Sequence, residues 1–129
     1  MKNDPKFHPT PSELAILQIL WTRGPSTVRE IHEILAQEKD VGYTSALKLL
    51  QIMTTKGIVK RTEEQRAHIY SANQPAEKTK QQFAADVVQR VFRGSASQLM
   101  QHVLSGRRSS KTEIEELRRM LDEYERKLP

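Results

Sequence analysis

Apolar positions recur at helical spacing through the first half of the chain and are interrupted at regular intervals by turn residues. The first helix is expected to begin at Thr10, because a threonine followed by proline and, three residues on, by glutamate is typical of a helix start. It is expected to end at Gly24. A second helix should begin at Ser26 or Thr27 and end before a short turn at residues 40–42.

A third helix is expected over residues 43–56, ending at Gly57, and its two sides differ in composition. One side is an apolar stripe at helical spacing, formed by Ala46, Leu49, Leu50 and Met53. The opposite side has no carboxylate and carries Thr44, Lys48, Gln51 and Thr55, with Ile52 beside them. A surface that approaches a polyanion and reads base edges needs this composition, although an ordinary amphipathic helix with a solvated face also fits.

Two short strands are expected after the third helix, at residues 59–63 and 67–72, joined by a turn at residues 64–66. Three short helices followed by a hairpin is the order of a winged helix-turn-helix. Residues 43–56 would then be the recognition helix and residues 59–72 the wing.

Beyond Pro75 the pattern is wholly helical, and three further helices are expected. A new helix should begin at Ser95 or Ser97, and the last one at a Thr112 cap followed by Glu115. Apolar positions of the last helix repeat at intervals of three and four, as in a coiled-coil seam that ends near Leu128. The candidate dimerisation residues of the three helices are Phe83, Val87, Val91, Leu99, Met100, Val103, Ile114, Leu117, Leu121 and Tyr124.

Three helices of this apolarity enclose too little volume for a good isolated core, so we expect a homodimerisation lobe. The alternative is that they pack back on the winged helix in one monomeric domain. The expected fold is therefore mostly α with a small β-hairpin wing. It comprises a flexible N-terminal arm at 1–9, a winged helix-turn-helix DNA-binding domain at 10–74 and a helical dimerisation domain at 75–129.

The charge of the chain agrees with a nucleic-acid partner without proving one. Net charge is +5 and the pI is about 9.6. The local excess lies at residues 41–72, where five lysine or arginine residues face only two glutamates. The candidate DNA contacts are Thr44, Ser45, Lys48, Gln51, Thr55, Lys60, Arg66 and His68. Within this set, Thr44 and Ser45 could instead cap the helix, and Lys60 alternates with Arg61 along a strand, so at most one of those two should face DNA well.

Other function classes lack their sequence signals. The absence of cysteine excludes disulfides and thiolate metal sites. The four histidines lie on four different expected elements without metal-ligand spacing, and no nucleophile or phosphate-loop motif occurs, so no metal, no cofactor and no enzymatic activity are expected. No apolar run of about 18 residues occurs, which predicts a soluble, cytoplasmic protein without membrane insertion.

Taken together, these segments resemble the BlaI/MecI type of bacterial winged-helix repressor. The likeness rests on PSELAILQILW at 11–21, GPSTVREI at 24–31, YTSALKLLQ at 43–51, KGIVKR at 56–61 and RAHIY at 66–70, with FRGSASQLM at 92–100 and IEEL at 114–117 downstream. The resemblance implies a homodimer that binds a palindromic double-stranded DNA operator and blocks transcription, with the third helix in the major groove and the wing on the flanking backbone.

Three departures from the family pattern bear on regulation and specificity. Several members are inactivated by a protease that cuts the dimerisation lobe at a position aligned with His102–Val103, where this chain lacks the asparagine–phenylalanine pair of those members. The copper-responsive branch carries Cys-x-Cys motifs, which a chain without cysteine cannot form. Ile52 stands where members commonly carry arginine, which implies a different operator.

One further hypothesis belongs to another class. Winged helices also serve as protein-interaction modules, since a fold does not fix a function. Such a module usually presents aromatic or aliphatic anchors, and only Leu47 and Ile52 qualify on the third helix. The carboxylate-free face and the basic hairpin favour DNA.

Overall fold

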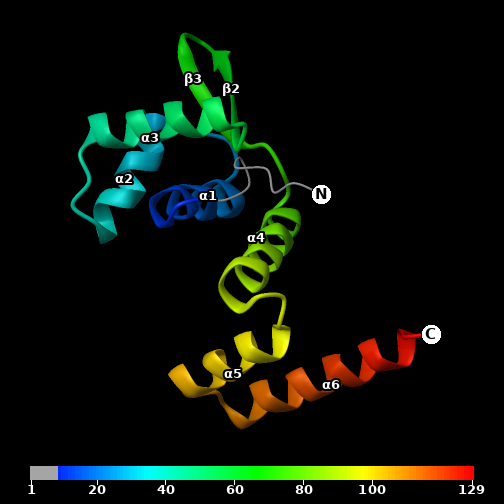
Figure 1. Ribbon diagram of the computed structural model, residues 1–129. Helices are drawn as coiled ribbons and strands as arrows, with labels where there is room; N and C mark the ends of the chain where they lie inside the picture. The colour runs from blue at the N-terminus through cyan, green and yellow to red at the C-terminus, as the bar shows by residue number, and fades with distance from the viewer. Residues whose placement is uncertain (1–8) are drawn as a thin grey trace. The chain divides into compact units, whose positions relative to one another are not determined.

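The computed structural model describes residues 9–129, which form six helices and three strands. Figure 1 labels the helices and the two longer strands. In chain order these are α1 (Pro11–Arg23), β1 (Ser26–Thr27), α2 (Val28–Glu38), α3 (Tyr43–Lys56), β2 (Val59–Glu64), β3 (Ala67–Ala72), α4 (Ala76–Phe92), α5 (Ala96–Gly106) and α6 (Lys111–Lys127). The expected N-terminal arm lies, except for Pro9, outside the described residues. The expected fold class, mostly helical with a small antiparallel wing, is confirmed.

The chain divides into two compact units, residues 1–87 and 88–129, and the division falls inside α4. The functional boundary expected between residues 74 and 75 coincides with the loop before α4 and stays a prediction.

Helices α1 and α2 begin at reciprocal capping boxes, as the sequence predicts. The Thr10 side chain accepts a hydrogen bond from the Glu13 backbone N–H at 3.2 Å, and the Glu13 carboxylate accepts one from the Thr10 N–H at 2.9 Å. Thr27 and Glu30 repeat this arrangement at the start of α2. Thr27, not Ser26, is therefore the cap of α2. The turn after α1 is made at Gly24, whose φ of 92° favours glycine.

The sheet contains a strand that the sequence pattern does not reveal. Its order is β1-β3-β2, with all neighbours antiparallel. Strand β1 is only two residues long and pairs Ser26 with Tyr70 and Thr27 with Ile69. Strand β2 reaches Glu64, one residue further than expected, so the hairpin turn contains only Gln65 and Arg66.

The core of residues 1–87 lies between α1, α2, α3 and the base of the sheet. Its buried apolar members are Ile16, Leu17, Leu20, Val28, Ile31, Leu35, Ala46, Leu50, Met53, Ile58, Val59 and Tyr70. Three of the four residues in the predicted apolar stripe of α3 are fully buried there, and Leu49 packs against the cluster. Burial of this stripe fixes which side of α3 faces outward.

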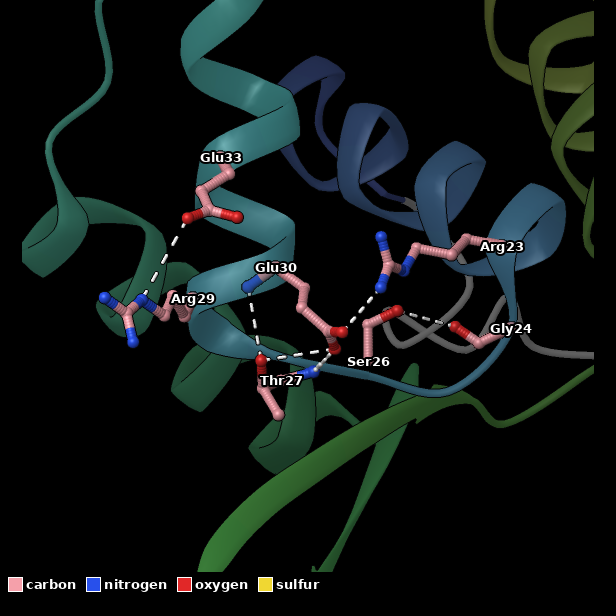
Figure 2. Close-up of polar contacts among 7 residues, drawn as sticks. All are labelled: Arg23, Gly24, Ser26, Thr27, Arg29, Glu30 and Glu33. Carbon is pink, nitrogen blue, oxygen red and sulfur yellow. Dashed lines mark hydrogen bonds and ion pairs between the residues drawn. The ribbon is translucent and has the colours of Figure 1, made fainter.

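A polar cluster joins the end of α1 to the start of α2 (Figure 2). The Arg23 guanidinium donates to the Glu30 carboxylate, and the Ser26 hydroxyl donates to the Gly24 carbonyl at 2.9 Å. The hydrogen bond from the Thr27 backbone N–H, together with the positive charge of Arg23, holds the pKa of Glu30 below its usual value despite partial desolvation.

Residues 88–129 contain the end of α4, all of α5 and all of α6. None of these residues is fully buried. Ser95 caps α5, one of the two expected alternatives. The expected Thr112 cap of α6 is wrong: the helix begins at Lys111, and the Ser110 side chain accepts from the Glu113 N–H at 3.0 Å. Two overlapping cap patterns occur there, and the earlier one gives the longer helix.

Candidate nucleic-acid interface

The outward side of α3 is a polar surface to which the helix itself contributes no carboxylate. Burial of the apolar stripe leaves the five candidate contact residues of this helix exposed: Thr44, Ser45, Lys48, Gln51 and Thr55. We call them, together with the exposed Ile52, the outward face of α3. Lysine and glutamine side chains are suited to guanine and adenine edges, and the hydroxyls are suited to bases or phosphates.

Neither Thr44 nor Ser45 caps α3. The N-cap is Gly42, which has no side chain to offer, and Tyr43 is the first helical residue. The first helical hydrogen bond runs from the Ala46 N–H to the Gly42 carbonyl at 3.1 Å. Both hydroxyls therefore lie inside the first turn and are not engaged as caps, which leaves them available to a partner approaching the positive end of the helix.

Thr55 has one of its hydrogen-bonding roles already occupied. Its hydroxyl donates to the Gln51 carbonyl one turn earlier, at 3.1 Å. The hydroxyl hydrogen of Thr55 is therefore already used, and its oxygen suits a donor on a partner better than an acceptor.

Lys56 does not belong to the outward face, although it contributes to the local positive charge of the sequence. Its Nζ lies 2.9 Å from Oε2 and 3.1 Å from Oε1 of Glu13, whose side chain is only 2% exposed. The pair connects the end of α3 to the start of α1. Sequence reasoning missed it because the two residues are 43 positions apart and Glu13 was already explained as a capping residue.

The register of the hairpin separates two of the candidate wing contacts. Lys60 is opposite Ser71, whereas His68 is opposite Glu63. Side chains alternate between faces along a strand, so Lys60 and His68 lie on opposite faces of the hairpin. His68 shares its face with the buried Tyr70, while Lys60 is on the other face. A DNA backbone that passes along one side of the hairpin cannot contact both faces of the hairpin equally.

Arg66 lies at the tip of the wing, where it is exposed. It has a φ of 69° and the preceding Gln65 has a φ of 51°, both in the left-handed region. A two-residue hairpin turn with both residues in this region matches the twist of the strands, but it normally uses asparagine and glycine. Arg66 therefore occupies a position that costs backbone energy and places a positive charge at the furthest point of the hairpin.

A small contact set surrounds the turn between α2 and α3. The His32 Nε2 lies 2.8 Å from the Val41 carbonyl oxygen, and because a carbonyl only accepts, Nε2 carries the hydrogen. The His32 ring also meets the ring of Tyr43 edge-on, with 5.8 Å between centroids. These contacts hold Tyr43, the first residue of α3. Sequence reasoning did not single out the contact between His32 and Tyr43.

The candidate dimerisation residues are distributed over both units. Phe83 and Val87 belong to residues 1–87, and the other candidates belong to residues 88–129. Most are partly buried, but Val91, Leu121 and Tyr124 are 66%, 69% and 73% exposed. The exposed seam of α6 continues to Leu128.

The described residues, 9–129, contain no group of three or more histidine, cysteine, aspartate or glutamate side chains placed to hold a metal ion. In the same part of the chain, every helix is too short or too polar to cross a membrane.

Comparison with known proteins identifies the family of this chain. The model of the family described as Penicillinase repressor matches residues 9–123. The chain belongs to the penicillinase repressor family. This membership confirms the resemblance to the BlaI/MecI type and makes the chain a member of a family of DNA-binding transcriptional repressors.

Individual members of the penicillinase repressor family differ in how much of the chain they match. The Transcriptional regulator BlaI of Mycobacterium tuberculosis (strain H37Rv) is 38% identical over 60 residues, which are 46% of this chain and 44% of that regulator. The Penicillinase repressor of Staphylococcus aureus is 23% identical over 116 residues, 90% of this chain and 92% of that repressor. The chain thus matches less than half the length of BlaI but nearly the whole staphylococcal repressor.

Solved structures share the fold of this penicillinase repressor family member. The YusO protein from Bacillus subtilis superposes with a TM-score of 0.51 at 19% identity, covering 93% of this chain and 77% of YusO. Overoxidized AbfR bound to DNA, a protein of Staphylococcus epidermidis, superposes with a TM-score of 0.50 at 24% identity, covering 77% and 76%. At these identities the likeness concerns the fold alone.

Proposed function

We propose that this penicillinase repressor family member is a sequence-specific repressor that acts as a homodimer on a palindromic operator. The α3 helix enters the major groove, the β2–β3 wing lies on the adjacent backbone, and the helices of residues 75–129 join two copies. The function is binding without catalysis, and the protein acts in the cytoplasm, where the DNA is.

The observation that carries the proposal is the outward face of α3. Thr44, Ser45, Lys48, Gln51 and Thr55 are exposed together on a helix without aspartate or glutamate. A carboxylate there would repel phosphates, whereas short hydroxyl, amide and ammonium groups hydrogen-bond to base edges. We assign Lys48 and Gln51 to bases, Thr44 and Ser45 to the groove entrance, and Arg66 to a phosphate.

The wing contacts require a choice between faces. We keep Lys60 and Arg66 as backbone contacts, since a lysine and an arginine neutralise phosphate. His68 lies on the other face, beside Glu63 across the ladder, where the carboxylate weakens its use for phosphate. The same solved fold has been observed on DNA in AbfR.

The homodimer is supported by what residues 88–129 lack. None of their side chains is fully buried, so the unit has no closed core of its own. Leu121 and Tyr124 of α6 and Leu128 directly after it are spaced by three and four residues, and each is about 70% exposed. A second copy of the same helix supplies the matching seam and buries these side chains.

Inactivation by a protease near His102–Val103 remains a prediction. Both residues lie inside α5, and the His102 ring lies 5.5 Å from that of Phe92 between centroids. Proteases bind extended chain, so a cut here requires α5 to open locally first.

The function is tested by titrating the purified protein on a fluorescent duplex from its own upstream region and on a scrambled duplex, at two salt concentrations. A repressor should prefer its operator by about a thousandfold or more and lose affinity steeply with salt. Equal, weak binding to both would contradict binding at this site. A genome-wide binding selection would then distinguish an operator elsewhere from a winged helix that serves a protein partner.

A further inference from the structure

One aliphatic side chain of α3 does not take part in the core. The helix carries six aliphatic or thioether residues, and Ala46, Leu47, Leu49, Leu50 and Met53 are in the core cluster or pack against it. Ile52 is absent from that set and is 39% exposed. Its side chain therefore contributes less to the core than the other five do, and isoleucine is a poorer helix former than lysine, glutamine or alanine.

Ile52 lies among the polar residues of the outward face. Lys48 is one turn before it, Gln51 is next to it, and Thr55 is three positions after it. Residues three and four apart are neighbours on a helix surface, so the branched side chain of Ile52 stands beside the side chains of Lys48 and Thr55. All three neighbours are exposed.

We propose that Ile52 reads the C5-methyl group of a thymine in each half-site, and so is a specificity-determining residue of the proposed DNA interface. In the major groove, base edges present hydrogen-bond donors and acceptors, and the thymine methyl is the apolar group among them. The polar neighbours bring the helix to the base edges, and Ile52 supplies an apolar surface larger than the single methyl group of Thr55. This inference rests on the proposed function.

A protein partner fits this surface less well. The other exposed large apolar side chain of α3 is Tyr43, which is 48% exposed. It is nine residues from Ile52, and nine steps of about 100° place the two on opposite sides of the helix. The remaining exposed large apolar residues of the described chain all lie at positions 91–128. Ile52 therefore stands alone, whereas anchors of protein interfaces cluster.

The experiment begins with selection of binding sequences from a pool of random duplexes by the wild-type full-length protein and by Ile52→Ala. Each thymine that the wild type enriches is then replaced, one at a time, by deoxyuridine, which lacks only the methyl group. Ile52 lies outside the core cluster and alanine is the better helix former, so Ile52→Ala should keep the fold, with an unfolding midpoint close to that of the wild type. Ile52→Val, which keeps a branched apolar side chain, is the conservative control.

At one thymine in each half-site, the change to uracil should weaken wild-type binding roughly fourfold, the value of one buried methyl group. Ile52→Ala should bind the thymine and uracil duplexes equally, and Ile52→Val should retain a preference for thymine. If the wild type binds uracil as well as thymine at every position, or if Ile52→Ala keeps the wild-type ratio, the inference is wrong while the proposed function stands. Enrichment of no sequence at all would overturn both.

Discussion

The Nζ of Lys56 lies 2.9 Å from the Oε2 of Glu13, so the last residue of α3 is paired with the first turn of α1. The same carboxylate accepts the backbone N–H of Thr10. One buried acidic group thus satisfies the start of one helix and fixes the end of another. Its charge is compensated inside the fold, so Lys56 adds stability and orientation where the sequence shows only another basic residue.

Replacement of Lys56 by methionine should therefore lower stability, not DNA specificity. Glu13 would remain as a nearly fully buried carboxylate without its cation, at a cost of about 1–3 kcal/mol, reduced by the partial exposure of Lys56. Urea unfolding measures the effect. Lys60→Met is the matched control, since Lys60 is exposed, and its change should stay within about 0.5 kcal/mol. Equal losses in both variants would contradict the role of the pair.

Lys48→Ala should have the opposite profile. Lys48 is exposed on the outward face, so the unfolding midpoint should not change, while specific binding should weaken by about 1–3 kcal/mol and one operator position should become degenerate. Selection from randomised duplexes measures the change in specificity. A uniform loss of affinity for all sequences would instead make Lys48 a phosphate contact.

Arg66→Asn should stabilise the protein and weaken its binding to DNA. Asparagine tolerates the positive φ of this position better than arginine, so stability should rise by up to about 1 kcal/mol. Loss of one phosphate contact should lower affinity for every sequence and reduce the salt slope by about one. Thermal unfolding and titrations at several salt concentrations measure the two effects. An unchanged salt slope would show that the wing tip does not reach the backbone.

Leu121→Asp should convert the protein to monomers. The change places a charge in the exposed seam of α6. It should greatly weaken operator binding, because the two protein copies that bind the two half-sites are no longer linked. Sedimentation velocity measures the oligomeric state. Arg119→Asp introduces the same side chain on the outer side of the heptad and should remain dimeric. A dimeric Leu121→Asp would place the interface on other helices.

Acidification should remove a contribution to stability that comes from Glu30. Its pKa in the folded protein lies below the ordinary 4.5, so the ionised form is favoured by folding. The contribution is fully present above the unfolded pKa and is lost as the pH falls through the lower folded value. Glu30→Gln should therefore be less stable than wild type at pH 7, and the difference should narrow below about pH 4.5.

Glu33→Gln provides the comparison for this pH experiment. Glu33 meets Arg29 only at 4.0 Å, and both side chains are largely exposed, so little change is expected at any pH (Figure 2). Urea midpoints across pH 3–7 measure both variants. A constant gap between wild type and Glu30→Gln over this range would contradict the assigned cause.

Local patterns in the sequence carried the prediction of the fold. Thr10 and Thr27 could be recognised as caps because each partner glutamate is three residues away, and the apolar stripe of α3 follows one helical period. Strand β1 escaped because two residues have no period, and it exists only through pairing with the distant β3. At α6, two overlapping cap patterns competed, and sequence alone could not choose Ser110 over Thr112.

The residue types and exposure of the candidate site could be predicted from the sequence, but the contacts between distant residues could not. Exposure of Lys48 and Gln51 follows from burial of the opposite stripe. The neutralisation of Lys56 does not, because Glu13 is far away in the sequence and has a sufficient local role. The opposite placement of Lys60 and His68 needed the turn length, since one residue more in the turn would have moved His68 to the other face.

The core of α1–α3 and the sheet is built from residues between Ile16 and Tyr70, with Ala72 packed against it. The surface proposed to read DNA therefore has its own support, and changes in residues 88–129 would act on the proposed link between two copies. A tethered second copy meets its half-site at an effective concentration in the millimolar range, whereas a released copy is limited by its concentration in the cell. Loss of dimerisation alone would then relieve repression, while each winged-helix domain stays folded.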